Sequence, residues 1–152
     1  MNEDTVKLLR ECSSGAKIVV DSIEEVMPHV KNSVLAQSLN TCRDEHEKIG
    51  AKVDGMLTAL GEETKSPNVM AKGMSWVKTN FKLSLTPDDS TAAGLITDGC
   101  NMGIKSLTRY LNEYTAAQES AKDIAKELIK SEDICTQNIR EFLLLMKTEI
   151  FA

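Results

Sequence analysis

The residues of this sequence that could do chemistry are its cysteines and one of its two histidines. They stand on the apolar faces of predicted helices: Cys12, Cys42, Cys100, Cys135 and His46. His46 follows Cys42 by four residues, so the two side chains share one face of a helix. Thiolate and imidazole are the ligands that zinc and copper(I) prefer. The residue types therefore indicate a soft-metal site.

Height along the predicted helices determines which of these groups could meet. Counted from the first helix–helix turn at about 1.5 Å per residue, Cys42 lies about 15 Å along the bundle, His46 about 21 Å and Cys12 about 30 Å. On the same scale Cys100 lies at about 20 Å and Cys135 nearer the turn. If a metal binds, we predict that Cys42, His46 and Cys100 form its site, with zinc or copper as the ion. Cys12 and Cys135 are not expected to join it.

Two other interpretations of these residues stay open. The sequence contains no C-x-x-C motif, and a free cysteine commonly behaves as a small buried hydrophobe. On that interpretation the protein holds no cofactor, and His46 bonds to a backbone carbonyl or to water. In the other, Cys42 is a nucleophile with His46 as its base, but no pattern suggests an oxyanion hole or a glycine-rich loop. We therefore predict no catalytic residue and expect a protein that is not an enzyme.

Four amphipathic helices must position these residues. Apolar residues recur at alternating steps of three and four in four segments, at about residues 4–31, 33–60, 87–114 and 116–147. Asn32 is expected to cap the second helix and Gly61 to end it. Pro28 is expected to kink the first helix without ending it. The inward stripe of the last helix is expected to pass through Ser131 and Cys135.

Such helices bury their stripes in a four-helix bundle. The turns near Asn32 and Thr115 are short, so each pair of helices forms an antiparallel hairpin. The connection between the hairpins is long and has its own helix start, Ser66–Pro67, followed by an apolar face. A helix there could travel the length of the bundle and make the second and third long helices parallel. The prediction is one all-α domain over residues 1–152, with a long crossover that carries a short extra helix.

Together with two strings, this topology resembles the ferritin-like superfamily. The strings are Ala71-Lys72-Gly73-Met74-Ser75-Trp76 and Gly99-Cys100-Asn101-Met102-Gly103-Ile104, and within the superfamily they resemble a family of uncharacterised bacterial bundles. The resemblance implies the ferritin-like fold and a bacterial cytoplasmic origin, but it implies no activity.

The di-iron chemistry of ferritin-like oxidases needs glutamates and Glu-x-x-His motifs that face inward. Neither histidine has a glutamate three residues before it, and Cys135 stands where a histidine would follow Glu132. The four predicted stripes contain no Asp or Glu. We therefore predict a non-catalytic structural or interaction protein, with the soft-metal site or a degenerate di-iron oxidase as the alternatives.

Composition limits the partners. The net charge is −5 and Lys and Arg form no cluster, which argues against nucleic-acid binding. The longest uncharged run, Asn32–Cys42, is too short and too polar to cross a membrane. The acidic amino terminus is unlike a signal peptide, so a cytoplasmic location with reduced thiols is expected. The segment from Phe142 to Phe151 is apolar on more than one face, which favours a homodimer.

Overall fold

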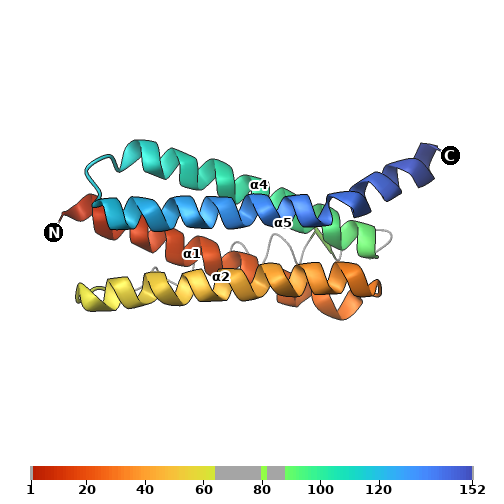
Figure 1. Cartoon of the computed structure of the whole chain (residues 1–152), viewed down its shortest axis with the longest axis horizontal. Helices are drawn as coiled ribbons and strands as arrows, with labels where there is room; N and C mark the ends of the chain where they lie inside the picture. Colours follow the sequence, from red (N-terminus) through yellow and green to blue (C-terminus); the bar gives the residue numbers. More distant parts are fainter. Residues whose placement is uncertain (1, 64–79, 82–87, 152) are drawn as a thin grey trace.

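Four long α-helices make up almost all of the described chain. The computed structural model describes residues 2–63, 80–81 and 88–151, with side chains described as far as residue 143. The helices are α1 (Glu3–Val26), α2 (Ser33–Ala59), α4 (Asp89–Glu113) and α5 (Glu119–Phe151). They lie side by side along one long axis (Figure 1). The described residues contain no strand, so the all-α prediction is confirmed.

The connectivity follows from contacts at the two ends of the bundle. At one end, the Asp89 carboxylate that begins α4 accepts hydrogen bonds from the backbone N–H groups of Lys31, at 2.7 Å, and Asn32, at 2.8 Å. At the other end, the N–H of Ala116 donates to Asp4 at 3.1 Å. Thus α1–α2 and α4–α5 are antiparallel hairpins, and α2 and α4 run in the same direction (Figure 1). The extra helix expected after Ser66 falls in residues 64–79 and 82–87, which lie outside the described part of the chain.

The helix ends follow local chemistry. Asn32 caps α2 through its side-chain oxygen, which accepts from the N–H groups of Val34 and Leu35. At the other end of α2, Gly61 has a φ of +73° and the N–H of Glu62 donates to the Leu57 carbonyl, which completes a Schellman motif. Both predicted caps are confirmed.

Pro28 does more than kink the first helix, so that prediction is wrong. The α-helix ends at Val26 and the chain continues as one 3₁₀ turn, η1 (Met27–His29). Proline has no N–H to donate to the carbonyl four residues earlier, and its ring crowds that carbonyl. The tighter turn brings the chain round to Asn32.

The core consists of two apolar clusters with a polar layer between them. One cluster includes Cys42, Cys100 and Cys135, and the other includes Cys12 and Leu128. Along α2 and α5, two fully buried polar side chains separate the clusters: His46 and Glu132. The predicted stripes largely form this core, but in α5 Glu132 faces inward and Ser131 is half-buried.

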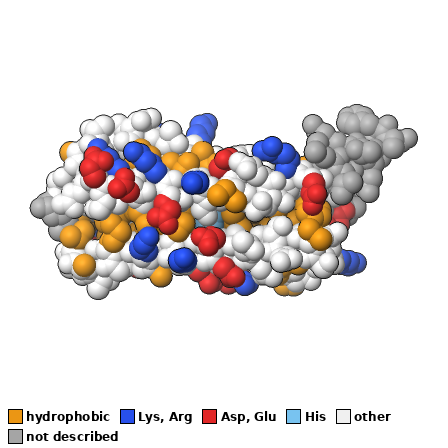
Figure 2. All heavy atoms as spheres, viewed as in Figure 1, with side chains coloured by type: hydrophobic (Ala, Val, Ile, Leu, Met, Phe, Trp, Pro, Cys, Tyr) orange, Lys and Arg blue, Asp and Glu red, His pale blue; other side chains and the backbone are white. Residues whose placement is uncertain are grey.

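Charged side chains of both signs are intermixed over the face shown in Figure 2, with hydrophobic side chains between them. Among the residues with described side chains, the large exposed hydrophobic ones are Val34, Met102 and Ile134, which lie on three different helices. Within the described residues, no helix combines the length and the apolar character that crossing a bilayer requires.

Candidate functional site

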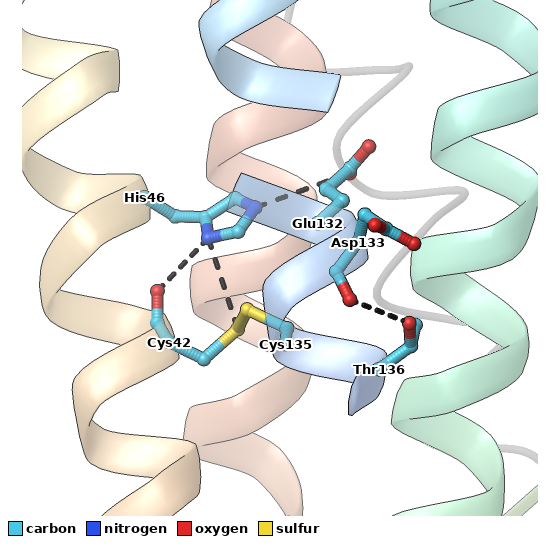
Figure 3. The surroundings of a disulfide bond; sticks show 6 residues. All are labelled: Cys42, His46, Glu132, Asp133, Cys135 and Thr136. Atoms are coloured by element: carbon cyan, nitrogen blue, oxygen red, sulfur yellow. Dashed lines mark hydrogen bonds and ion pairs between the residues drawn. A yellow bond between two sulfur atoms is a disulfide. The ribbon is translucent and has the colours of Figure 1, made fainter. Parts of the chain in front are cut away.

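A disulfide bond between Cys42 and Cys135 joins α2 to α5 inside the core (Figure 3). The Cα atoms of the two residues are 5.6 Å apart, although the residues are separated by 93 positions in the sequence. Both side chains are buried. Two expectations are therefore wrong: Cys135 does join Cys42, and the cysteines are not all free thiols.

The arrangement of the helices explains why Cys135 takes the place predicted for Cys100. Helix α2 packs against α1 and α5, and α4 likewise packs against α1 and α5, so α2 and α4 occupy opposite corners of the bundle. Cys42 and Cys100 point into the same core cluster but do not belong to one ligand group. The position of a residue along the bundle axis does not show whether its helix is a neighbour of α2 or lies diagonally opposite to it.

His46 lies directly against the disulfide. Its Nδ1 atom donates a hydrogen bond to the backbone carbonyl of Cys42 at 2.9 Å and lies 3.8 Å from the Cys42 sulfur. The expected bond from His46 to a backbone carbonyl is thus confirmed. Burial lowers the pKa of His46, and the bond to the Cys42 carbonyl opposes that shift. The imidazole is therefore neutral at neutral pH.

Glu132 is the buried carboxyl group of the described chain, and its presence contradicts the prediction of an interior free of acids. Its Oε1 atom lies 4.0 Å from Nε2 of His46, which is too long for a hydrogen bond. Nε2 of His46 and Oε2 of Glu132 have no hydrogen-bond partner. Burial raises the pKa of Glu132 to about 8, so the carboxyl group is mainly protonated at neutral pH.

The signal for Glu132 was present in the sequence. Leu128, Glu132, Cys135 and Ile139 are spaced by four, three and four residues, which is as regular as the path through Ser131. The two possible inward-facing stripes differ only in whether Ser131 or Glu132 faces the core. Serine is less costly to bury than glutamate, so the stripe through Ser131 was predicted. Glu132 fits because Gly103 on α4 has no side chain, and a Cβ atom there would lie 2.8 Å from the Glu132 Cδ.

The two remaining cysteines are buried free thiols. The pKa of Cys12 is raised to about 12, first by burial and then by the nearby charges of Glu11 and Glu132. Burial, and then Glu132, also raise the pKa of Cys100. Neither thiol ionises at neutral pH, so neither is a ready nucleophile.

Of the three chemistries that the sequence suggested, metal binding is the one for which the described residues bring a possible ligand group together. The ligand atoms of Cys42, His46 and Cys135 all lie within 4.8 Å of one another. A nucleophile must reach its substrate, whereas Cys42 is only 4% exposed and is bonded to Cys135. A di-iron pair needs several inward carboxylates, and the described residues bury only Glu132.

No protein-family model and no curated protein matches this chain.

Proposed function

We propose that this protein is a non-catalytic helical bundle that binds one soft metal ion, copper(I) or zinc, through Cys42, His46 and Cys135 when the two cysteines are reduced. The observation that carries the proposal is the convergence of two sulfur atoms and a ring nitrogen within 4.8 Å in the buried core. This ligand set shares Cys42 and His46 with the set predicted from sequence, and Cys135 replaces Cys100.

The donors fit such an ion. Zinc–sulfur and zinc–nitrogen bonds of about 2.0–2.3 Å place tetrahedral ligands about 3.5–4 Å apart, close to the 3.8 Å between the Cys42 sulfur and Nδ1 of His46. Three soft donors in an apolar setting also suit copper(I), which accepts low coordination numbers. Two thiolates in this core would be costly without a cation, so binding and deprotonation would occur together.

The buried pair of His46 and Glu132 also supports the proposal. Metal binding through Nδ1 requires the imidazole proton to move to Nε2, the nitrogen that faces Glu132 at 4.0 Å. Metal-ligating histidines usually donate their other N–H to a carboxylate or a carbonyl. A small movement would then give Nε2 of His46, which has no partner in the disulfide form, a hydrogen bond to Oε1 of Glu132.

Disulfide formation and metal binding use the same two sulfur atoms and therefore exclude each other. Reduction by a thiol reductant transfers two electrons and two protons to the disulfide and leaves the Cys42 and Cys135 thiols. A cytoplasm keeps thiols reduced, so the cytoplasmic location that we propose would favour the metal-binding form.

We infer that an ion would enter through a cleft of about 250 Å³ between α1 and α2, which reaches His46 but has neither cysteine in its lining. His46 lies among its lining residues, together with three carboxylates and one lysine: Asp21, Glu47, Asp54 and Lys17. The lysine pairs with Asp54 at 3.1 Å. The excess of negative charge would attract a cation and disfavour an anion.

The proposal is tested with protein that has been reduced and kept anaerobic. Titration with zinc, or with copper(I) in competition with a coloured chelator, should give one bound ion per chain and a raised Tm. Cys135→Ala should lose binding, and Cys100→Ala, which removes an equally buried thiol outside the ligand group, should retain it. X-ray absorption should show sulfur and nitrogen ligands.

Two results would contradict the proposal. One is an unchanged Tm with both metals in fully reduced protein. The other is loss of binding in Cys100→Ala with retention in Cys135→Ala, which would restore the set predicted from sequence. Metal analysis of protein purified anaerobically shows which ion is bound in the cell.

A second candidate is a purely structural or interaction role, and the disulfide itself favours it. A covalent bond between α2 and α5 fastens two neighbouring helices without any ligand. For either function we propose a ferritin-like bundle of bacterial origin, which is supported by the parallel course of α2 and α4. The homodimer stays a prediction, and light scattering tests it.

A further inference from the structure

A second cleft, on the other side of α1 from the first, leads to Glu132. It lies between α1 and α4, has a volume of about 260 Å³ and has Glu132 of α5 among its lining residues. This cleft is separate from the Cys42–Cys135 disulfide, which joins α2 and α5. It is not needed for the proposed metal site.

Glycines create this cleft. Gly15 of α1 and Gly99 and Gly103 of α4 line it, and all three lie inside helices. A Cβ atom at residue 15 or 99 would meet nothing within 4 Å, so side chains are absent where there is room for them. A glycine inside a helix costs about 0.5–1 kcal/mol relative to alanine, so Gly15 and Gly99 need a reason other than helix packing.

The polar groups of the cleft supply that reason. Glu132 is 1% exposed, and its Oε2 atom has no hydrogen-bond partner. Ser14, which also lines the cleft, is 2% exposed and its Oγ atom has no partner either. Buried oxygens without partners are costly and are typically satisfied by water or by a ligand.

The other lining residues define the chemistry of a ligand. The acidic residues that line this cleft are Glu11 and Glu132, with no Lys, Arg or His. The remaining surface is mainly apolar, from residues such as Ile18, Val19 and Met102. A single buried carboxyl group cannot supply the six or more oxygen ligands of calcium, and an anion would meet no positively charged residue. A monovalent organic cation meets neither objection. Glu132 is mainly protonated without a ligand, and a cation beside it would favour its ionised form.

We propose that this cleft binds a small primary ammonium ion with a compact apolar body. Its N–H groups would donate to Oε2 of Glu132 and to Oγ of Ser14, and its apolar part would lie between Ile18 and Met102. At about 30 Å³ per water-sized group, the cleft holds a molecule of roughly nine non-hydrogen atoms.

The test uses the full chain and a series of primary amines from butylamine to phenethylamine, each matched with the alcohol and the carboxylic acid of the same skeleton. Calorimetry and NMR chemical shifts should show saturable binding of the amines. The alcohols should bind about tenfold or more weakly, because they lose a charge-assisted hydrogen bond. The carboxylic acids should not bind.

Three variants locate the site. Glu132→Gln should weaken amine binding about tenfold or more, since the amide keeps an acceptor oxygen but no charge. Gly99→Leu should abolish binding by filling the cleft. Gly55→Leu is the matched control, because a Cβ at residue 55 of α2 also meets nothing within 4 Å but does not line this cleft.

Three outcomes would overturn the inference: no saturable amine binding by the wild-type chain, equal affinity for amines and alcohols, or equal amine affinity in Gly99→Leu and Gly55→Leu. A wild-type dimer that Gly99→Leu dissociates would also overturn it, by assigning the cleft to a second copy of the chain. None of these measurements involves Cys42 or Cys135, so this inference and the metal proposal can fail independently.

Discussion

Nε2 of His46 and Oε1 of Glu132 lie 4.0 Å apart in the interior, and the two side chains are 0% and 1% exposed. Burial moves their two pKa values in opposite directions, downward for the imidazole and upward for the carboxyl group. The pair is therefore held mainly in its neutral form near neutral pH. Lowering the pH should protonate His46 and raising it should ionise Glu132, and either change should lower the stability of the folded protein.

The pKa of Glu132 predicts that the protein loses stability as the pH rises from about 6.5 to 8. In the unfolded chain the carboxyl group ionises near 4.5, whereas in the folded state it keeps its proton up to about 8. The folded state therefore binds more protons across this range, and its stability falls with pH. At about 1.4 kcal/mol per pH unit, the loss over this window is about 2 kcal/mol. Denaturant unfolding at several pH values measures it.

Glu132→Gln should remove this slope. His46 affects stability in the opposite direction, because its pKa is lower in the folded than in the unfolded protein. That effect is confined to pH values below about 6.5, the pKa of an unperturbed histidine. The slope above pH 6.5 therefore reports on Glu132. The free energy of unfolding of the variant should stay constant between pH 6.5 and 8. Relative to that of the wild type, it should therefore increase toward pH 8. Glu141→Gln, on the exposed surface, is the control. A wild-type slope that persists in Glu132→Gln would contradict the assignment.

Reduction of the Cys42–Cys135 disulfide should lower the free energy of unfolding by about 2–5 kcal/mol, measured in denaturant without metal. The bond closes a long loop, since its ends are 93 positions apart in the sequence, and most of its effect is to restrict the unfolded chain. After oxidation, alkylation of the denatured protein should label only Cys12 and Cys100.

A double variant provides the control for the effect of reduction. In Cys42→Ala/Cys135→Ala, the reductant should leave the unfolding midpoint unchanged. In Cys100→Ala, it should lower the midpoint as in the wild type. Labelling of all four cysteines in the oxidised, denatured protein would show that the bond does not form.

Asp89 should contribute to stability by holding the two hairpins together. Its carboxylate accepts hydrogen bonds from the N–H groups of Lys31 and Asn32, which otherwise belong to the turn between α1 and α2. Asp89→Ala should cost about 1–3 kcal/mol in denaturant unfolding, because it removes two charge-assisted bonds. Asp133→Ala, which alters an exposed residue inside α5, is the comparison. Equal effects of the two substitutions would contradict a role for Asp89 in joining the hairpins.

The helices of this fold could be predicted from local patterns because their signals are local. Alternating steps of three and four identified all four long segments, and Asn32 and Gly61 marked the ends of α2. The effect of Pro28 was underestimated because a regular stripe continues past it. That stripe records which side chains face inward, and it does not record whether the backbone keeps α-helical hydrogen bonds.

The site was only half predictable for a different reason. Cys42 and His46 lie on one helix, so their spacing alone brings them together. The third member depends on which helices are neighbours, and apolar stripes on four helices do not encode that order. Glu132 was missed because an inward glutamate is tolerated only where another helix leaves room, and that room comes from Gly103 on α4.

Gly103 and Glu132 should therefore be strongly coupled. Gly103→Ala places a Cβ atom against the Glu132 carboxyl group, so despite the better helix propensity of alanine it should destabilise the protein by about 1–3 kcal/mol. Gly99→Ala, one turn earlier in α4 and facing open space, should stabilise it by about 0.5–1 kcal/mol. In a Glu132→Ala background the clash is gone, so Gly103→Ala should become as favourable as Gly99→Ala. Denaturant unfolding of this double-mutant cycle measures the coupling, and additive effects would show that the carboxyl group does not lie against Gly103.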